Sequence, residues 1–163
     1  MKNLLILGAG QYGMVTKEVA ESMNCFDKIA FLDDNNPIAI GKIVDYKDFV
    51  SEYECAVVAI GNPEIRMKFL KQLEEVGYDI PILIHSRAYV SQSAKIGAGT
   101  IIEPMAVVHT EVHVGKDCLI SAGAILNHNS VINEGTHINC GSIVNARIVV
   151  ERNTRTECGV VLK

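Results

Sequence analysis

Short apolar runs alternate with longer segments of helical periodicity along the first half of the chain. The runs are rich in aliphatic residues, as in Leu4-Leu5-Ile6-Leu7, and are short enough to be buried strands. The predicted strands cover residues 4–7, 29–32, 55–60 and 82–84, and the predicted helices cover residues 11–24 and 64–76. Strands that alternate with helices are typical of a parallel sheet built from βαβ units. Residues 1–86 are therefore predicted to form a small α/β domain, with too few strands for a complete dinucleotide-binding fold.

A different pattern begins at Val90. Aliphatic residues recur every six positions, and small or β-branched residues follow each of them four positions later. The aliphatic series comprises Val90, Ile96, Ile102, Val108, Val114, Ile120, Leu126, Ile132, Ile138, Val144, Val150 and Leu162, with Thr156 as its one weak member. This is the hexapeptide repeat of a parallel β-helix, in which three consecutive hexapeptides close one coil. We expect residues 87–163 to form about four coils, whose inward aliphatic residues stack into a continuous core.

Composition and charge narrow the possible functions. The chain has 163 residues, a net charge of -4 and no cluster of Lys or Arg, which argues against nucleic-acid binding. No apolar run approaches the length of a membrane span, and the run at 4–7 meets Gly8 too early for a signal peptide. The five cysteines form no C-x-x-C motif, so reduced thiols in a cytoplasmic protein are expected.

The segment Gly8-Ala9-Gly10-Gln11-Tyr12-Gly13 is a complete G-x-G-x-x-G motif between a predicted strand and a predicted helix. Such glycines let the backbone approach a phosphate at the positive end of the helix. Asp33 and Asp34 end the second predicted strand, where an acidic residue would meet a ribose. A mononucleotide or nucleotide sugar is the predicted ligand. Two alternatives stay open: NAD binding in an oxidoreductase, and glycines that serve only a tight turn.

A second loop of the α/β domain is predicted to border the same crevice. Gly61 and Asn62 follow the third predicted strand, and loops at the carboxyl ends of parallel strands line ligand sites. Arg66 could face this crevice as well. Asn62 could instead only cap the following helix, which has Pro63 at its first position.

Four histidines fall within the hexapeptide repeats. His128 lies in the polar stretch Asn127-His128-Asn129-Ser130, and the three-hexapeptide coil stacks it below Ala146. A partly buried neutral imidazole among polar groups is suited to general-base catalysis near neutral pH. His109 and His113 are expected to face solvent or to bond between subunits.

No metal site is predicted from the histidines or the cysteines. The histidine pairs 109/113 and 128/137 do not have the spacing of the zinc-binding β-helix enzymes, although a metal-dependent lyase of that type remains an alternative. Cys140 and Cys158 are separated by one whole coil and should stack, but no second close pair completes a set of four ligands. We interpret them as packing residues.

The chain resembles the bacterial nucleotide-sugar acetyltransferases, a group that includes N-acetyltransferases of UDP-4-amino-dideoxy sugars, perosamine N-acetyltransferase and sialic acid O-acetyltransferases. The resemblance runs through the whole chain in order. It is carried by residues 8–13, 31–34 (Phe-Leu-Asp-Asp), 59–66, 83–90 and 127–138 (Asn-His-x-x-Val-Ile, then His-Ile).

The resemblance implies a Rossmann-like domain joined to a left-handed parallel β-helix, assembled as a homotrimer for surface-glycan biosynthesis. His128 would be the general base that takes a proton as the sugar amine or hydroxyl attacks acetyl-CoA, with Asn129 beside it. His137 would lie near the acetyl group, and Ala146 would contact the CoA arm. The nucleotide sugar would lie near Gly8, Gly10, Gln11, Tyr12, Gly13, Asp33, Asp34, Gly61 and Asn62. No metal is required.

Two departures from the family pattern support a further alternative. The family usually has an acidic residue directly after the catalytic histidine, where this chain has Asn129. Because an amide brings no charge to stabilise the imidazolium, His128 is expected to be a weaker base. Family members also continue for further coils that hold the CoA arm. The alternative is a catalytically impaired homologue that binds nucleotide sugars or serves in assembly.

Overall fold

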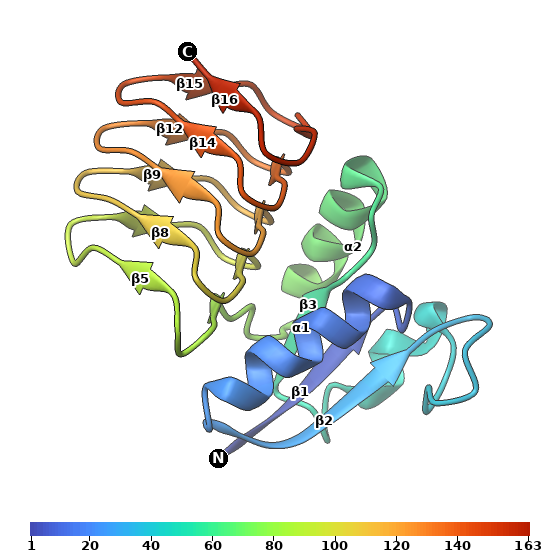
Figure 1. Cartoon of the computed structure of the whole chain (residues 1–163). Helices are drawn as coiled ribbons and strands as arrows, with labels where there is room; N and C mark the ends of the chain where they lie inside the picture. Colours follow the sequence, from blue (N-terminus) through green and yellow to red (C-terminus); the bar gives the residue numbers. More distant parts are fainter. The chain divides into compact units, whose positions relative to one another are not determined.

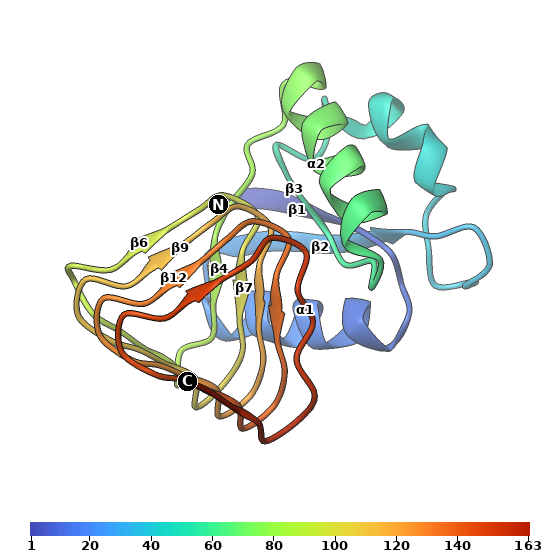
Figure 2. The ribbon, with the colours of Figure 1, turned by 90° about the horizontal axis from the view of Figure 1, so that it is seen from above.

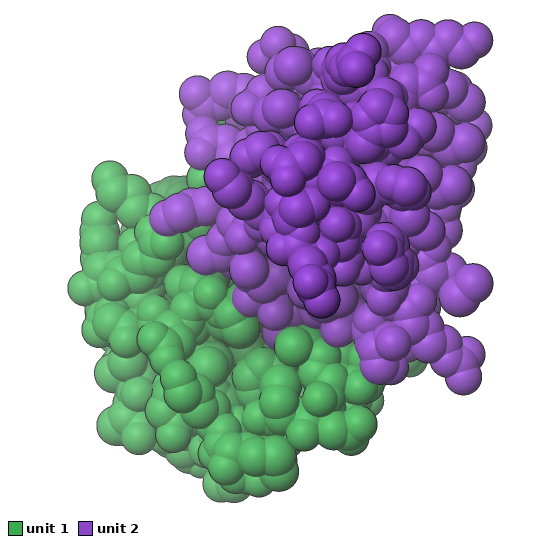
Figure 3. Space-filling view, turned by 90° about the vertical axis from the view of Figure 1, so that its left-hand side faces the viewer, with its two compact units in different colours: residues 1–81 green, residues 82–163 purple.

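The computed structural model describes residues 1–163, which divide into two compact units, Met1–Pro81 and Ile82–Lys163 (Figure 3). The first unit is an α/β domain. Its elements are β1 (Lys2–Leu7), α1 (Gln11–Ser22), β2 (Phe26–Leu32), the 3-10 helix η1 (Ile43–Phe49), β3 (Cys55–Val58) and α2 (Pro63–Val76).

The strands of the first unit form a parallel sheet in the order β2-β1-β3. The central strand β1 is the most apolar, and residues Leu4 to Leu7 are fully buried. In both ribbon views α1 covers one face of the sheet and α2 the other (Figures 1 and 2). The predicted α/β architecture is confirmed, and its parallel order places the loops after β1, β2 and β3 at one edge.

The predicted fourth strand belongs to the second unit, so its assignment to the α/β sheet was wrong. Leu83–Ile84 (β4) pairs in parallel with Ile101–Ile102 (β7). Ile84 precedes Val90 by one hexapeptide and therefore extends the aliphatic series by one member. The observed division at 81/82 accordingly precedes the expected one at 86/87.

The second unit is a left-handed parallel β-helix of two-residue strands (Figure 1). Sheet B contains β4, β7, β10 (Leu119–Ile120) and β13 (His137–Ile138). Sheet C contains β5 (Tyr89–Val90), β8 (Val107–Val108), β11 (Ile125–Leu126), β14 (Ile143–Val144) and β16 (Val161–Leu162). Sheet D contains β6 (Lys95–Ile96), β9 (His113–Val114), β12 (Val131–Ile132) and β15 (Val149–Val150). Paired residues are always three hexapeptides apart, and the coils nest behind one another in Figure 2.

The second residue of each two-residue strand points into the prism. Ile120, Leu126, Ile138 and Val144 are fully buried, as the hexapeptide period predicted. Thr156 replaces an aliphatic residue and has only an isolated bridge beside it instead of a strand. Its hydroxyl is used inside the coil, where it accepts a hydrogen bond of 2.8 Å from the backbone N–H of Asn139. Because that polar group is satisfied, the weak member of the series does not break the stack.

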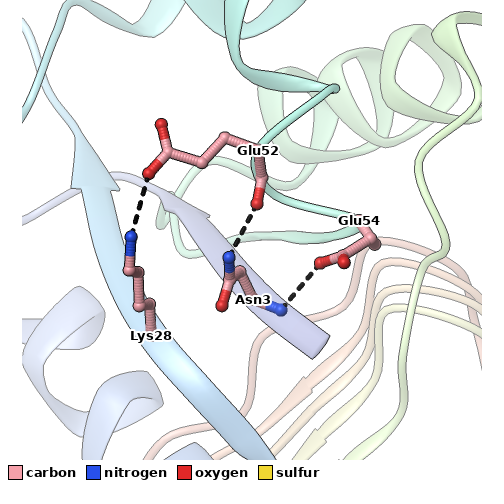
Figure 4. A network of polar contacts seen from close by, with 4 residues as sticks. All are labelled: Asn3, Lys28, Glu52 and Glu54. Atoms are coloured by element: carbon pink, nitrogen blue, oxygen red, sulfur yellow. Dashed lines mark hydrogen bonds and ion pairs between the residues drawn. The ribbon is translucent and has the colours of Figure 1, made fainter. Parts of the chain in front are cut away.

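Exposed polar contacts tie the amino end of β1 to its neighbours (Figure 4). The backbone N–H of Asn3 donates to the carboxylate of Glu54 at 2.8 Å, and the Asn3 amide donates to the backbone carbonyl of Glu52 at the same distance. The Glu52 carboxylate also pairs with Lys28 at 3.3 Å. These contacts lie at the edge of the sheet opposite the glycine-rich turn. Neither α-helix has the length and apolar composition needed to cross a lipid bilayer.

Candidate functional site

The glycines of the turn between β1 and α1 serve two different purposes. Gly8 has φ +105, and a Cβ added to Gly13 would lie 2.2 Å from the carbonyl oxygen of Gly8. The fold therefore requires both glycines. Gly10 has φ −73, which any residue can adopt, and a Cβ there would meet no atom within 4 Å. Since the fold does not require a glycine at position 10, the open space beside it is available to a ligand.

The amino terminus of α1 lies at the same turn. Gly10 is its N-cap and supplies no side-chain hydrogen bond, and no acidic residue lies in the first turn. The exposed Gln11 and half-buried Tyr12 begin the helix. Unpaired N–H groups at a helix start attract an anion such as a phosphate.

Asp33 holds two loops together at the carboxyl edge of the sheet. Its carboxylate accepts hydrogen bonds from the backbone N–H groups of Ala9 (2.8 Å), Asn35 (2.9 Å) and Asn36 (2.9 Å). These bonds, that from Ala9 foremost, hold the pKa of Asp33 below its ordinary value. Asp34 is exposed, and one of its oxygens accepts a bond of 3.2 Å from the N–H of Ile43. Asp33 thus has a clear structural role, and Asp34 is the more open of the two acids.

The loop after β3 combines an open glycine with a fixed backbone. A Cβ at Gly61 would meet nothing within 4 Å. Asn62 caps α2 by accepting a bond of 3.0 Å from the N–H of Ile65. The buried Arg66 points into the loop rather than into a crevice, because its guanidinium donates to the carbonyl oxygens of Ile60 (2.9 Å) and Gly61 (3.3 Å). Asn62 and Arg66 therefore shape the loop that presents Gly61.

His128 lies at the corner between sheets C and D and is exposed in this chain, not partly buried as expected. A corner residue points away from the prism, and no other segment of this unit covers it. Its Nδ1 lies 3.0 Å from Oδ1 of Asn129. Because an amide oxygen can only accept, this contact is a hydrogen bond when Nδ1 carries the proton, and in that tautomer Nε2 is the nitrogen without a proton. Asn129 itself has φ +61, a left-handed conformation that Asn tolerates well.

His137 is held by a serine of the preceding coil. Its Nε2 lies 2.9 Å from the hydroxyl oxygen of Ser121, which is buried. The backbone N–H of Ser121 also donates to the carbonyl of Ile138 at 2.9 Å, so the two coils are fixed on both sides of the contact. Ser121 was not among the predicted site residues. Ser121 stacks directly below Asn139, which is two positions after His137. The side chains of Ser121 and His137 therefore meet as diagonal neighbours of adjacent coils.

The two histidines lie on different sides of the prism. His137 is on sheet B, whereas His128 and Ala146 share the opposite corner. A face of five to six extended residues is roughly 17 Å wide, so one acetyl group cannot touch both histidines of one chain. The predicted residues therefore come together only in part.

A column of open glycines runs along the corner between sheets B and C. Gly123, Gly141 and Gly159 follow one another at intervals of one coil, have φ between +65 and +69, and would place a Cβ in open space. Their spacing of one coil is visible in the sequence, but these glycines were not among the predicted site residues. Such a column leaves room for an extended ligand along the coils.

The structure contains no group of three or more His, Cys, Asp or Glu side chains that could hold a metal ion. His109 and His113 are exposed, as expected. Cys140 and Cys158 are also exposed, so their interpretation as packing residues was wrong. They lie on a corner, where side chains point away from the prism.

Two segments of the chain match known families. Residues 3–73 match the PglD N-terminal domain, and residues 93–128 match the bacterial transferase hexapeptide of six repeats. One curated relative is UDP-N-acetylbacillosamine N-acetyltransferase of Bacillus subtilis (strain 168). It is 30% identical over 112 residues, which are 63% of this chain and 51% of the relative. The chain thus spans about half the length of that relative.

Solved structures resemble nearly the whole chain. The acetyltransferase domain of PglB from Neisseria gonorrhoeae FA1090 has a TM-score of 0.94 at 26% identity, over 99% of this chain and 82% of that chain. The same domain in complex with acetyl coenzyme A has a TM-score of 0.93 at 28% identity, over 98% and 81%. A mutant of perosamine N-acetyltransferase from Caulobacter crescentus, with CoA and GDP-perosamine, shares the fold at 19% identity and a TM-score of 0.71, over 95% and 91%.

Proposed function

Because the chain joins a PglD N-terminal domain to transferase hexapeptides, and so resembles the bacterial nucleotide-sugar acetyltransferases along its whole length, we propose that it acetylates a nucleotide-linked amino sugar with acetyl-CoA. The observation that carries the proposal is the pair His128–Asn129. The amide oxygen lies 3.0 Å from Nδ1 of the exposed imidazole and favours the tautomer in which Nε2 has no proton. A general base needs such an accessible, unprotonated nitrogen.

The proposed reaction needs one base and a well-positioned thioester. The sugar amine attacks the thioester carbonyl carbon, so that a C–N bond forms while Nε2 of His128 takes a proton from the nitrogen. The C–S bond then breaks, and the proton passes from the imidazolium to the departing CoA thiolate. Asn129 supports this cycle by accepting the hydrogen bond from Nδ1 throughout. No covalent enzyme intermediate is required.

Asn129 also favours a second candidate, an impaired homologue that binds the nucleotide sugar and transfers acetyl groups slowly. An amide orients the imidazole as a carboxylate would but does not stabilise its cation by charge. The two candidates differ in turnover and not in nucleotide-sugar binding.

We place the nucleotide at the carboxyl edge of the α/β sheet. The diphosphate would lie at the start of α1, near Gly8, Gly10, Gln11, Tyr12 and Gly13, where the helix end is positive and the space beside Gly10 is open. Asp34, Gly61 and Asn62 would border the nucleoside, with Asp33 fixing the loops beneath it. All five cysteines are free, which agrees with action in the reducing cytoplasm.

A homotrimer would complete the site. The outward residues of sheet C form an apolar stripe, in which Tyr89 is 59% and Val161 46% exposed. The stripe comprises Tyr89, Val107, Ile125, Ile143 and Val161. A stripe of this kind is suited to contact with a second copy. Since His128 and His137 of one chain lie on opposite sides, acetyl-CoA would lie between copies. It would contact His137 of one copy, with Ala146 or the glycine column Gly123, Gly141 and Gly159 along its arm.

The test is the variant His128→Ala, with His109→Ala as its matched control. His109 is an exposed histidine at the same corner of the preceding coil. Release of CoA thiol would be followed with acetyl-CoA and a panel of UDP- and GDP-linked amino sugars. We expect His128→Ala to lose transfer and keep nucleotide-sugar affinity, and His109→Ala to keep both. Transfer that survives in His128→Ala would contradict the assigned role.

Ser121 allows a separate test of His137. Ser121→Ala removes the 2.9 Å partner of Nε2, whereas Ser121→Thr retains a hydroxyl. The alanine variant should raise the KM for acetyl-CoA, and the threonine variant should restore it. An unchanged KM in both variants would remove His137 from the acetyl-CoA site.

A further inference from the structure

Two free cysteines lie one above the other at the corner between sheets B and C. Cys140 and Cys158 are one coil apart, exposed and not in a disulfide. Each is followed by a glycine in the same left-handed conformation, with φ +65 at Gly141 and +69 at Gly159. The N–H of Gly159 donates to the carbonyl of Cys140 at 2.9 Å, which locks the two corners in register. The equal conformations of the two glycines and the shared register place the two cysteines one above the other at this corner.

The spacing of the coils decides what this pair can bind. Stacked parallel strands are about 4.8 Å apart, so the two Cβ atoms are separated by about the same distance. A relaxed disulfide has its Cβ atoms about 3.5–4.5 Å apart, which is slightly closer than the spacing of the coils. Zinc–thiolate bonds are about 2.3 Å long, and on that scale one ion held between two sulfurs needs them about 4.6 Å apart. The coil spacing is close to that of two sulfurs holding a linear ion and slightly wider than that of a disulfide, and both thiols are free.

The ligand set selects the kind of ion. No third His, Cys, Asp or Glu joins the pair, so a four-coordinate zinc site cannot form from this chain. Thiolates are soft ligands and favour soft ions such as Cu⁺, which is stable with two ligands. The missing side chains of Gly141 and Gly159 leave open space beside both thiols.

We propose that Cys140 and Cys158 form a two-thiolate site for one monovalent copper ion per chain. Binding of Cu⁺ releases two protons, since both thiols become thiolates. The bound ion is two-coordinate and needs no third protein ligand. No electron is transferred in this step. The site borders the corner at Gly141 and Gly159, which is one of the two places proposed above for the arm of acetyl-CoA, but it uses neither His128 nor the glycine-rich turn. Binding of Cu⁺ can therefore be measured without acetyl-CoA and without acetyl transfer.

The test is an anaerobic titration of the full chain with Cu⁺ in competition with a chromophoric Cu⁺ chelator. The variants are Cys140→Ser and Cys158→Ser, with Cys25→Ser as the matched control, since Cys25 is an exposed cysteine of the other unit. We expect one Cu⁺ per chain. Each single variant should weaken binding by more than about 100-fold, because even losing a neighbour of a ligand costs about 10- to 100-fold.

Three results would overturn the proposal. The first is unchanged affinity in Cys140→Ser or Cys158→Ser. The second is a loss of affinity in Cys25→Ser. The third is a rise in mass by light scattering when Cu⁺ is added, which would mean that the ion joins two copies. X-ray absorption with two sulfur neighbours and no nitrogen would support the site.

Discussion

Replacing single glycines of the turn after β1 by alanine separates its structural from its ligand-binding role. At Gly13 the new Cβ would lie 2.2 Å from the carbonyl oxygen of Gly8, which is backbone and cannot move aside. At Gly10 it would meet nothing within 4 Å, and the observed φ of −73 suits alanine. The two variants therefore add the same methyl group at neighbouring points of one turn with opposite structural consequences.

The expected magnitudes follow from these contacts. A normal Cβ contact is longer than 3.4 Å, so Gly13→Ala must push two backbone segments apart by more than 1 Å. Overpacking of this kind costs about 1–3 kcal/mol, reduced by about 1 kcal/mol for the better helix propensity of alanine. Because the clash is with backbone, we expect a net loss at the upper end, about 2 kcal/mol. Gly10→Ala should cost only about 0.5 kcal/mol through its effect at the N-cap.

The assay combines urea unfolding with titration of a nucleotide sugar. We expect Gly13→Ala to lower the free energy of unfolding, and Gly10→Ala to leave it nearly unchanged while weakening nucleotide-sugar binding at least tenfold. Wild-type affinity in a stable Gly10→Ala variant would refute the placement of the ligand at this turn. The glycines would then serve the turn alone.

Three further predictions concern single side chains. Asn129→Asp should raise the rate of acetyl transfer by about 5- to 10-fold, because a carboxylate stabilises the His128 imidazolium by roughly 1 kcal/mol at an exposed site. Asn129→Gly should lower the rate. Both rates are measured as steady-state release of CoA. Asp33→Asn should destabilise the chain by about 1–2 kcal/mol at pH 7. The folded pKa of Asp33 lies below its ordinary value of 3.8. The difference in the free energy of unfolding between wild type and Asp33→Asn should therefore persist above pH 3.8 and vanish as the pH falls through the folded pKa. Urea unfolding at pH 7 and pH 3 would detect this change. Met105→Gly should raise the free energy of unfolding by about 0.5–1 kcal/mol, because Met105 is held at φ +62 and is 67% exposed. Thermal unfolding measures this effect. A lower melting temperature in the variant would contradict backbone strain at this corner.

The hexapeptide period was sufficient to predict the β-helix, because the inward position of nearly every hexapeptide is aliphatic and fills the prism, with Thr156 as the one exception. It also explains the error at residues 82–84. Ile84 fits the series, but a short apolar run looks the same in a central strand of an α/β sheet as in a coil.

Details of the candidate site depend on contacts that have no local signal in the sequence. The three hydrogen bonds to Asp33 come from two separate loops, and their geometry arises only when β1 and β2 pair. The exposure of His128 follows from its corner position, which the three-hexapeptide coil does imply. The contact between Ser121 and His137 joins adjacent coils diagonally. The two residues are slightly less than one coil apart, so the stacking of equivalent positions does not predict their contact.

The opposition of His128 and His137 across the prism has a genetic consequence for the proposed trimer. Two alleles that each lack one histidine would complement when expressed together, since mixed rings contain a junction with both imidazoles intact. An allele that lacks both would instead be dominant. Each of its chains would inactivate two of the three junctions in a ring, so the fraction of activity lost would exceed the fraction of defective chains.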